Sequence, residues 1–158
     1  MANFLKIEQY LEKQGIDYKI IDLGAEIFRV EDVVKAGVNP EEVVKTLLIR
    51  SVVKRGLEFK TEFNALAVRG RDRLDFKKVR RIFGPKTDLA KPEEVKEVVG
   101  VPVGAVCPIE IGVPVYFDNS VLKLKNVNLG SGDLTKGLDM ILEDLLKAVG
   151  EFEVKELV

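Results

Sequence analysis

Two spacings of apolar residues alternate along the 158 residues of this chain. An apolar residue at every third or fourth position is typical of a helix with one buried side, whereas alternation or a short apolar run is typical of a strand. Helices are accordingly predicted over residues 3–14, 31–36, 92–99 and 143–149, and from Asp72 or Asp75 to Phe83. Strands are predicted over residues 17–23, 43–53, 57–68, 113–117, 126–129, 137–142 and 152–157.

Turn signals indicate how these elements connect. Lys54-Arg55-Gly56 separates the two longest apolar strands and predicts a β-hairpin. Asn39-Pro40-Glu41-Glu42 combines a capping residue, a proline at the first helical position and two acids, which is a compact helix start. The order of elements, without a repeat or a linker, predicts one α/β (α+β) domain over residues 1–158. Its sheet is expected to be mixed and largely antiparallel, or a partial barrel, flanked by helices.

The composition narrows the class of protein. Apolar residues make up 46% of the chain and charged residues 32%, which is enough apolar surface for a folded core. No apolar run approaches the roughly 20 residues that span a bilayer, and the N-terminal segment lacks the basic-then-apolar pattern of a signal peptide. We therefore expect a cytoplasmic protein that does not associate with membranes.

The lack of histidine and the single cysteine exclude several catalytic mechanisms and metal sites. Histidine does not occur, and Cys107 is the only cysteine. Ser-His and Cys-His nucleophilic catalysis, His-ligated metal sites, a structural zinc site and an intrachain disulfide are all excluded. A hydrolase of this composition must use lysine, acids, threonine, backbone groups or the substrate itself.

Charge is distributed unevenly although the net charge is only −1. That balance argues against a generally basic, DNA-binding protein, yet residues 69–86 carry eight basic side chains against two acidic ones. On the predicted helix ending at Phe83, the apolar residues face the core, and the basic ones point away: Lys77, Lys78, Arg80 and Arg81. This face is either a contact for a polyanion or an ordinary solvated helix surface.

Lys45 is a charge within the apolar strand segment Val43-Val44-Lys45-Thr46-Leu47-Leu48-Ile49. A buried ammonium is costly unless it is paired or lines a cavity. The residue is therefore either an edge-strand lysine that points to solvent or a cation at a cavity mouth that holds a phosphate or carboxylate.

The segment Gly100-Val101-Pro102-Val103-Gly104-Ala105-Val106-Cys107-Pro108 is dense in glycine and proline. Such a segment is either an ordinary turn or a loop whose backbone amides approach a ligand closely. Cys107 has no histidine base and is expected to be a small buried side chain. Asp139 is a pocket acid or the polar side of a strand, and Phe28 is more often a core residue than a ligand contact.

The ordered motifs resemble the YbaK/EbsC family, which is related to the editing insertion of bacterial prolyl-tRNA synthetases. The run Pro40-Glu41-Glu42-Val43-Val44-Lys45-Thr46-Leu47-Leu48 resembles the family's helix and "KTL" strand, and Gly100–Pro108 resembles its G-x-x-x-G-x-x-x-P loop. Residues 114–122 look like the strand and turn that follow. Asn128-Leu129-Gly130, Gly137-Leu138-Asp139 and Glu143-Asp144-Leu145 are similar to its C-terminal portion, so the resemblance covers about residues 15–150.

The resemblance implies a free-standing deacylase that hydrolyses the ester between a wrong amino acid and the terminal adenosine of tRNA. It implies catalytic roles for Lys45, Gly104 and Asp139. Substrate contacts would come from Phe28, Thr46, Gly100, Cys107, Pro108, Asn128 and Gly130. By the same resemblance, alanine or cysteine on proline tRNA would be removed, and no metal or cofactor would be needed. The acceptor end of aminoacyl-tRNA is the first expected partner, and an aminoacyl-tRNA synthetase is the second. The basic helix face would contact tRNA phosphates.

Two features depart from the family pattern and bear on which amino acid is removed. Asn128 and Cys107 stand where serine is frequent, and residues 130–135 look like an insertion. Two other functions stay open: a non-catalytic module of the same fold that binds tRNA or a synthetase, and a small-molecule hydrolase or binding protein that uses Lys45 as an anion clamp.

Overall fold

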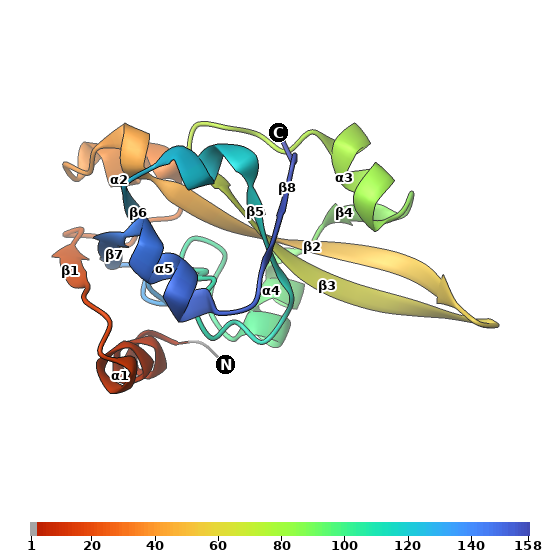
Figure 1. Ribbon diagram of the computed structural model, residues 1–158, viewed down its shortest axis with the longest axis horizontal. Coiled ribbons are helices and arrows are strands. Elements are labelled where there is room, and N and C mark those ends of the chain that lie inside the picture. The colour runs from red at the N-terminus through yellow and green to blue at the C-terminus, as the bar shows by residue number, and fades with distance from the viewer. Residues whose placement is uncertain (1–2) are drawn as a thin grey trace.

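The computed structural model describes residues 3–158, which form two sheets flanked by helices (Figure 1). The smaller sheet has the order β1-β7-β6 and is antiparallel: β1 Lys19–Asp22, β7 Lys136–Ile141 and β6 Asn126–Gly130. The larger sheet has the order β4-β2-β3-β5-β8: β4 Thr87–Leu89, β2 Val44–Arg55, β3 Glu58–Arg69, β5 Val115–Asp118 and β8 Glu153–Lys155. The helices are α1 Phe4–Gln14, α2 Val30–Lys35, α3 Phe76–Phe83, α4 Pro92–Val99 and α5 Leu142–Val149, with single 3₁₀ turns at η1 Pro40–Glu42 and η2 Asn119–Lys123.

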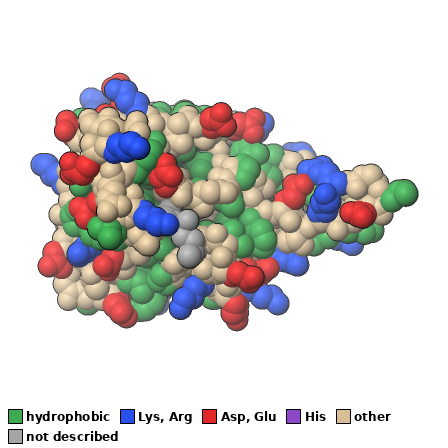
Figure 2. Space-filling model, turned by 90° about the horizontal axis from the view of Figure 1, so that it is seen from below, with side chains coloured by type: hydrophobic (Ala, Val, Ile, Leu, Met, Phe, Trp, Pro, Cys, Tyr) green, Lys and Arg blue, Asp and Glu red, His purple; other side chains and the backbone are tan. Residues whose placement is uncertain are grey.

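The β2–β3 hairpin is the longest feature of the molecule. The two strands pair antiparallel along their whole length, and their distal half extends away from the body (Figure 1). Figure 2 shows this half as a narrow projection that carries lysine and arginine side chains. At the other end of the hairpin, β4 pairs only with residues 49–51 of β2. The first residues of β2, Lys45 among them, therefore lie beyond the end of β4.

The two faces of the larger sheet pack against different apolar clusters. Val44 and Leu48 of β2 belong to the main core, together with residues of the smaller sheet, α1, α4 and α5. Leu47 and Ile49 belong to a second cluster that includes Val79 of α3. Because successive strand residues point to opposite faces, Lys45 lies on the side of the second cluster and Thr46 on the side of the main core.

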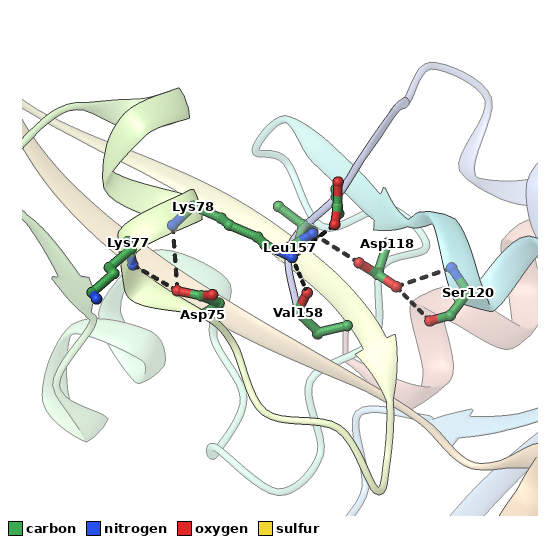
Figure 3. Close-up of polar contacts among 8 residues, drawn as sticks. Asp75, Lys77, Lys78, Asp118, Ser120, Leu157 and Val158 are labelled. Carbon is green, nitrogen blue, oxygen red and sulfur yellow. Dashed lines mark hydrogen bonds and ion pairs between the residues drawn. The ribbon is translucent and has the colours of Figure 1, made fainter.

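A buried carboxylate fixes the C-terminal segment against β5 (Figure 3). Asp118 is only 2% exposed and accepts hydrogen bonds from the Ser120 amide at 2.9 Å, from the Ser120 hydroxyl and from the Leu157 amide at 2.8 Å. Burial alone would raise the pKa of Asp118, but these donors outweigh burial and lower it. The charge stays on a carboxylate whose lone pairs are satisfied.

The structure confirms the predicted mixed α/β fold, and the two sheets formed by residues 3–158 do not close into a barrel. Every predicted helix and strand is present with small shifts at its ends, and the basic helix begins after Asp75 rather than Asp72, because the Asp75 side chain caps the amides of Lys77 and Lys78. Strand β4 and turn η2 were not predicted, because each is too short to show a periodic pattern. None of the helices among residues 3–158 combines the length and apolar character needed to cross a bilayer.

Candidate functional site

A cleft of about 840 Å³ opens beside the first residues of β2. One wall is formed by residues 27–35, which include α2, and another by residues 70–73 after β3. The remaining wall comes from residues 103, 104 and 106 and from the facing ends of β6 and β7. Six of the predicted site residues line this one cleft: Phe28, Lys45, Thr46, Gly104, Asn128 and Gly130.

Lys45 is half-buried in the cleft, which supports the cavity-mouth interpretation over the solvent-facing one. Burial lowers the pKa of its ammonium, as does the nearby Arg73, while Asp72 and Glu31 act in the opposite direction and the net shift is downward. Asp72 is itself held by Arg69 at 2.7 Å. Among residues 3–158, no carboxylate lies within ion-pair distance of the Lys45 ammonium. The charge is therefore available to an anionic group of a ligand.

Two of the four glycines that line the cleft allow segments of backbone to pack directly on one another. A Cβ on Gly104 would lie 2.6 Å from the Ile27 carbonyl oxygen, and one on Gly130 would collide with the Val106 carbonyl oxygen. Real Cβ atoms do not approach backbone this closely, so both positions require glycine. This part of the cleft wall is thus made of closely packed main chain, with the exposed Gly104 within it.

Two buried polar atoms in the cleft have no hydrogen-bond partner within residues 3–158. They are the Thr46 hydroxyl and the Asn128 side-chain nitrogen, on residues that are 8% and 3% exposed. A buried polar group without a partner costs about 1–3 kcal/mol, so proteins seldom retain one without a reason. The strands that carry these residues meet at a bridge between Val43 and Asn128.

Phe28 lies at the rim of the cleft and is 58% exposed. The expectation that Phe28 is more often a core residue is therefore wrong. A Cβ on Gly104 would lie 2.9 Å from the Phe28 Cα, so the Phe28 backbone packs closely against Gly104 while its ring is exposed. An exposed aromatic ring beside an unpaired ammonium is suited to an aromatic ligand.

Four other predicted site residues do not line the cleft. Gly100 ends α4 with a left-handed backbone, φ 86°, and Pro108 is buried behind the loop. Cys107 is fully buried, and burial raises the pKa of its thiol to about 12, so it is the inert small side chain that its lack of a base predicts. Asp139 is the cross-strand neighbour of Asn128 and accepts a hydrogen bond from Asn126 at 2.8 Å, one position away from the cleft.

The four cations of α3 divide into two kinds. Lys78 donates to Glu156 and to the Val158 carbonyl oxygen, both at 2.7 Å, and Arg80 donates to Asp88 at 2.8 Å and to the Thr87 carbonyl. Lys77 and Arg81 are exposed and make no ion pair with any residue from 3 to 158. All four side chains therefore lie on the surface, but those of Lys78 and Arg80 are held by the protein itself (Figure 3 shows Lys78).

Several residues of the cleft were not identified from the sequence. Arg73, Glu31 and Leu134 line it, as do the apolar residues of α2. Arg73 could have been considered from the sequence, because it belongs to the basic segment 69–86. Nothing in the sequence pattern marks Glu31 or Leu134 as a cleft residue, since their position depends on how α2 and the loop before β7 pack in the folded chain. The structure shows no cluster of three or more metal-ligating side chains among the described residues.

A family model for the aminoacyl-tRNA editing domain matches residues 25–148, which contain all the residues that line the cleft except Leu23. The chain belongs to this family. Membership confirms the resemblance drawn from the sequence and, with it, the expectation of an aminoacyl-tRNA deacylase. It does not by itself identify the amino acid or the tRNA.

Similar proteins fall into two groups. The editing domain shares 30% identity over 95 residues with the proline–tRNA ligase of Caldicellulosiruptor saccharolyticus, covering 60% of the domain and 15% of the ligase. The domain thus spans a small part of that relative. It also shares 27% identity over 111 residues with the uncharacterized protein YwhH of Bacillus subtilis, covering 66% of the domain and 71% of YwhH.

Solved structures agree over nearly the full chain. A candidate trans-editing enzyme for prolyl-tRNA synthetase superposes with a TM-score of 0.77 at 26% identity, covering 97% of this chain and 94% of that one. The hypothetical protein APE2540 superposes with a TM-score of 0.79 at 24% identity, covering 96% and 98%, and supports the fold alone.

Proposed function

We propose that this editing domain acts in trans on mischarged proline tRNA and hydrolyses the ester that joins a small amino acid to the terminal adenosine. One observation carries the proposal: Lys45, which has no ion pair among residues 3–158, shares a cleft with a wall of packed main chain. The relation to proline–tRNA ligases and to a candidate trans-editing enzyme for prolyl-tRNA synthetase supports the choice of tRNA.

In the proposed reaction Lys45 binds the terminal phosphate or ribose and holds the ester against the main-chain wall. The Lys45 ammonium has no carboxylate partner among the described residues, so no ion pair has to break before it binds the phosphate or ribose. The exposed Phe28 ring offers a stacking surface for the adenine.

Hydrolysis then needs a water that attacks the ester carbonyl carbon. The carbonyl oxygen gains negative charge as the water adds, and an amide at Gly104 stabilises this charge. The ribose hydroxyl next to the ester accepts a proton from the attacking water and passes its own proton to the ribose oxygen that leaves when the C–O bond breaks, so no histidine is required. The products are the free amino acid and a tRNA with intact terminal hydroxyls.

We further propose that tRNA phosphates are contacted by the exposed cations of α3, Lys77 and Arg81, rather than by all four. Lys78 and Arg80 already have protein carboxylates as partners, and a phosphate would have to displace these. Asp139 contributes indirectly, because it is the cross-strand neighbour of Asn128 and lies outside the cleft.

The experiment is a panel of tRNAs, each charged with one amino acid and tested under single-turnover conditions at equal enzyme concentration. Release of a small amino acid from proline tRNA, with correctly charged prolyl-tRNA spared, supports the deacylase. Tight tRNA binding without release would instead support a non-catalytic module. Turnover of a free amino acid ester that added tRNA leaves unchanged would support a small-molecule hydrolase.

A further inference from the structure

Thr46 and Asn128 share the cleft with apolar residues. Leu23, Ile27, Val106 and Leu134 line it, as does Gly137, which contributes no side chain. A Cβ on Gly137 would lie 3.2 Å from the Asn128 side-chain oxygen, so Gly137 packs closely against this amide. Asn128 lines the cleft, and its side-chain nitrogen is buried without a hydrogen-bond partner among residues 3–158.

Both unpartnered polar atoms of the described residues belong to this same cleft. The Thr46 hydroxyl can donate and accept a hydrogen bond, and the Asn128 amide nitrogen donates. Elsewhere in the structure the buried hydroxyls are paired: Ser51 with Thr87 at 2.8 Å, and Ser131 with the Lys136 carbonyl at 2.7 Å. The fold is thus able to satisfy buried polar groups and does so everywhere in the described residues except here.

Consecutive residues at the start of β2 line the cleft. Lys45 and Thr46 leave that strand on opposite faces, and both line the cleft. A ligand whose anionic end is at Lys45 therefore extends past the strand toward Thr46 and Asn128. In an aminoacyl-adenosine, the part that extends away from the phosphate and ribose is the amino acid.

Resting on the proposed function, we propose that Thr46 and Asn128 select an amino acid whose side chain carries a hydroxyl, so that a seryl ester is preferred over an alanyl ester. A side-chain hydroxyl is small enough for the cleft and can accept from Asn128 while it exchanges a hydrogen bond with Thr46. Alanine leaves both protein groups without a partner. Sites built to hydrogen-bond a substrate hydroxyl discriminate strongly against the analogue that lacks it.

The test compares seryl and alanyl esters on the same proline tRNA, so that contacts with the tRNA cancel. Single-turnover rates are measured for the wild-type protein, Thr46→Val and Asn128→Leu, which remove the polar atoms with little change in volume. We expect the wild type to hydrolyse the seryl ester at least about tenfold faster than the alanyl ester. Each variant should bring this ratio toward one, mainly by slowing serine.

Thermal unfolding of the same samples checks that each variant is folded. Replacing an unsatisfied buried group by an apolar one of similar shape is close to neutral, so Thr46→Val should melt at or above the wild-type temperature. A wild-type seryl-to-alanyl rate ratio of one or less, or a ratio that neither variant changes, would overturn this proposal. Hydrolysis of the alanyl ester in that case would still support the proposed deacylase function. If wild type hydrolyses neither ester, the proposed function fails and this inference fails with it.

Discussion

Two regions of the molecule bury polar groups: in one region these groups have hydrogen-bond partners, and in the other they do not. At the junction of β5 and the C-terminal segment, the Asp118 carboxylate accepts three hydrogen bonds and keeps its charge (Figure 3). In the cleft beside β2, the Lys45 ammonium lacks an ion pair and two further polar atoms lack hydrogen bonds, as far as residues 3–158 are concerned. The first arrangement stabilises the fold, whereas the second costs stability and leaves bonding capacity for a ligand. Polar groups at the two sites should therefore respond differently to mutation.

The largest effect is expected for Lys45→Met. Losing a charge that stabilises the reacting ester costs about 10²–10³-fold in the rate of deacylation. Stability should be unchanged or higher, because the variant removes a half-buried charge that has no ion-pair partner among residues 3–158. Single-turnover kinetics and thermal unfolding on the same preparation check both parts. A Lys45→Met protein that retains the wild-type rate would remove Lys45 from the mechanism.

The pH dependence of the wild-type rate sharpens the same prediction. Burial lowers the pKa of Lys45, so the ammonium loses its proton at a lower pH than an exposed lysine does. The enzymatic rate, corrected for spontaneous ester hydrolysis, should fall as the pH rises through that lowered value. This descending limb should be missing from the residual activity of Lys45→Met.

Asp118→Ala is the converse change. Removing the carboxylate leaves the Leu157 and Ser120 donors buried without an acceptor, at a cost of about 2–4 kcal/mol in the free energy of unfolding. The rate of the molecules that remain folded should be that of the wild type. Because the pKa of Asp118 is below its ordinary value of 3.8, its contribution is present above that pH and is lost on acidification. Denaturant titrations at neutral pH and near pH 3 should show the difference between the two proteins shrinking in acid.

The sequence predicted the helices and strands, because their apolar periodicity is local. It also identified Lys45, whose charge interrupts an apolar strand. It did not reveal that Thr46 and Asn128 lack partners, since a missing bond depends on which elements meet. Nor did it separate the cations of α3, because Asp88 and Glu156 reach that helix from other elements. For Phe28, apolarity alone favoured the core, whereas the family resemblance implied a substrate contact, and the ring is exposed and lines the cleft.

A smaller effect is expected on α3. Replacing both Lys77 and Arg81 with glutamate should weaken tRNA binding by about tenfold at low salt. The slope of the logarithm of the binding constant against the logarithm of the salt concentration should become shallower by about two, since each phosphate contact contributes nearly one to this slope. The matched control replaces Lys78 and Arg80 with glutamine, which should lower the melting temperature more than the affinity. Equal losses of affinity for the two pairs would show that the ion pairs do not decide which cations meet tRNA.

The smallest effect is expected for Cys107→Ser. The thiol is fully buried outside the cleft, so the rate of deacylation should stay within about twofold of wild type, with a loss of stability of about 1–2 kcal/mol for the buried hydroxyl. A pKa of about 12 also predicts that the native thiol resists disulfide reagents until the protein unfolds. Rapid labelling of the native protein, or a large loss of rate in Cys107→Ser, would place this residue in contact with substrate.

The central claim is that the cleft beside β2 holds the aminoacylated end of a tRNA, and the most direct measurement is an NMR titration of the wild-type protein. The probe is an alanyl-adenosine 5′-phosphate in which an amide replaces the ester, so that it is not hydrolysed. The account predicts saturable shifts of the Gly104 and Gly130 backbone amides and of the Asn128 side-chain amide, lost in Lys45→Met. Shifts confined to the separate hollow formed by residues 108–116 and 149–153, or none at millimolar probe, would contradict it.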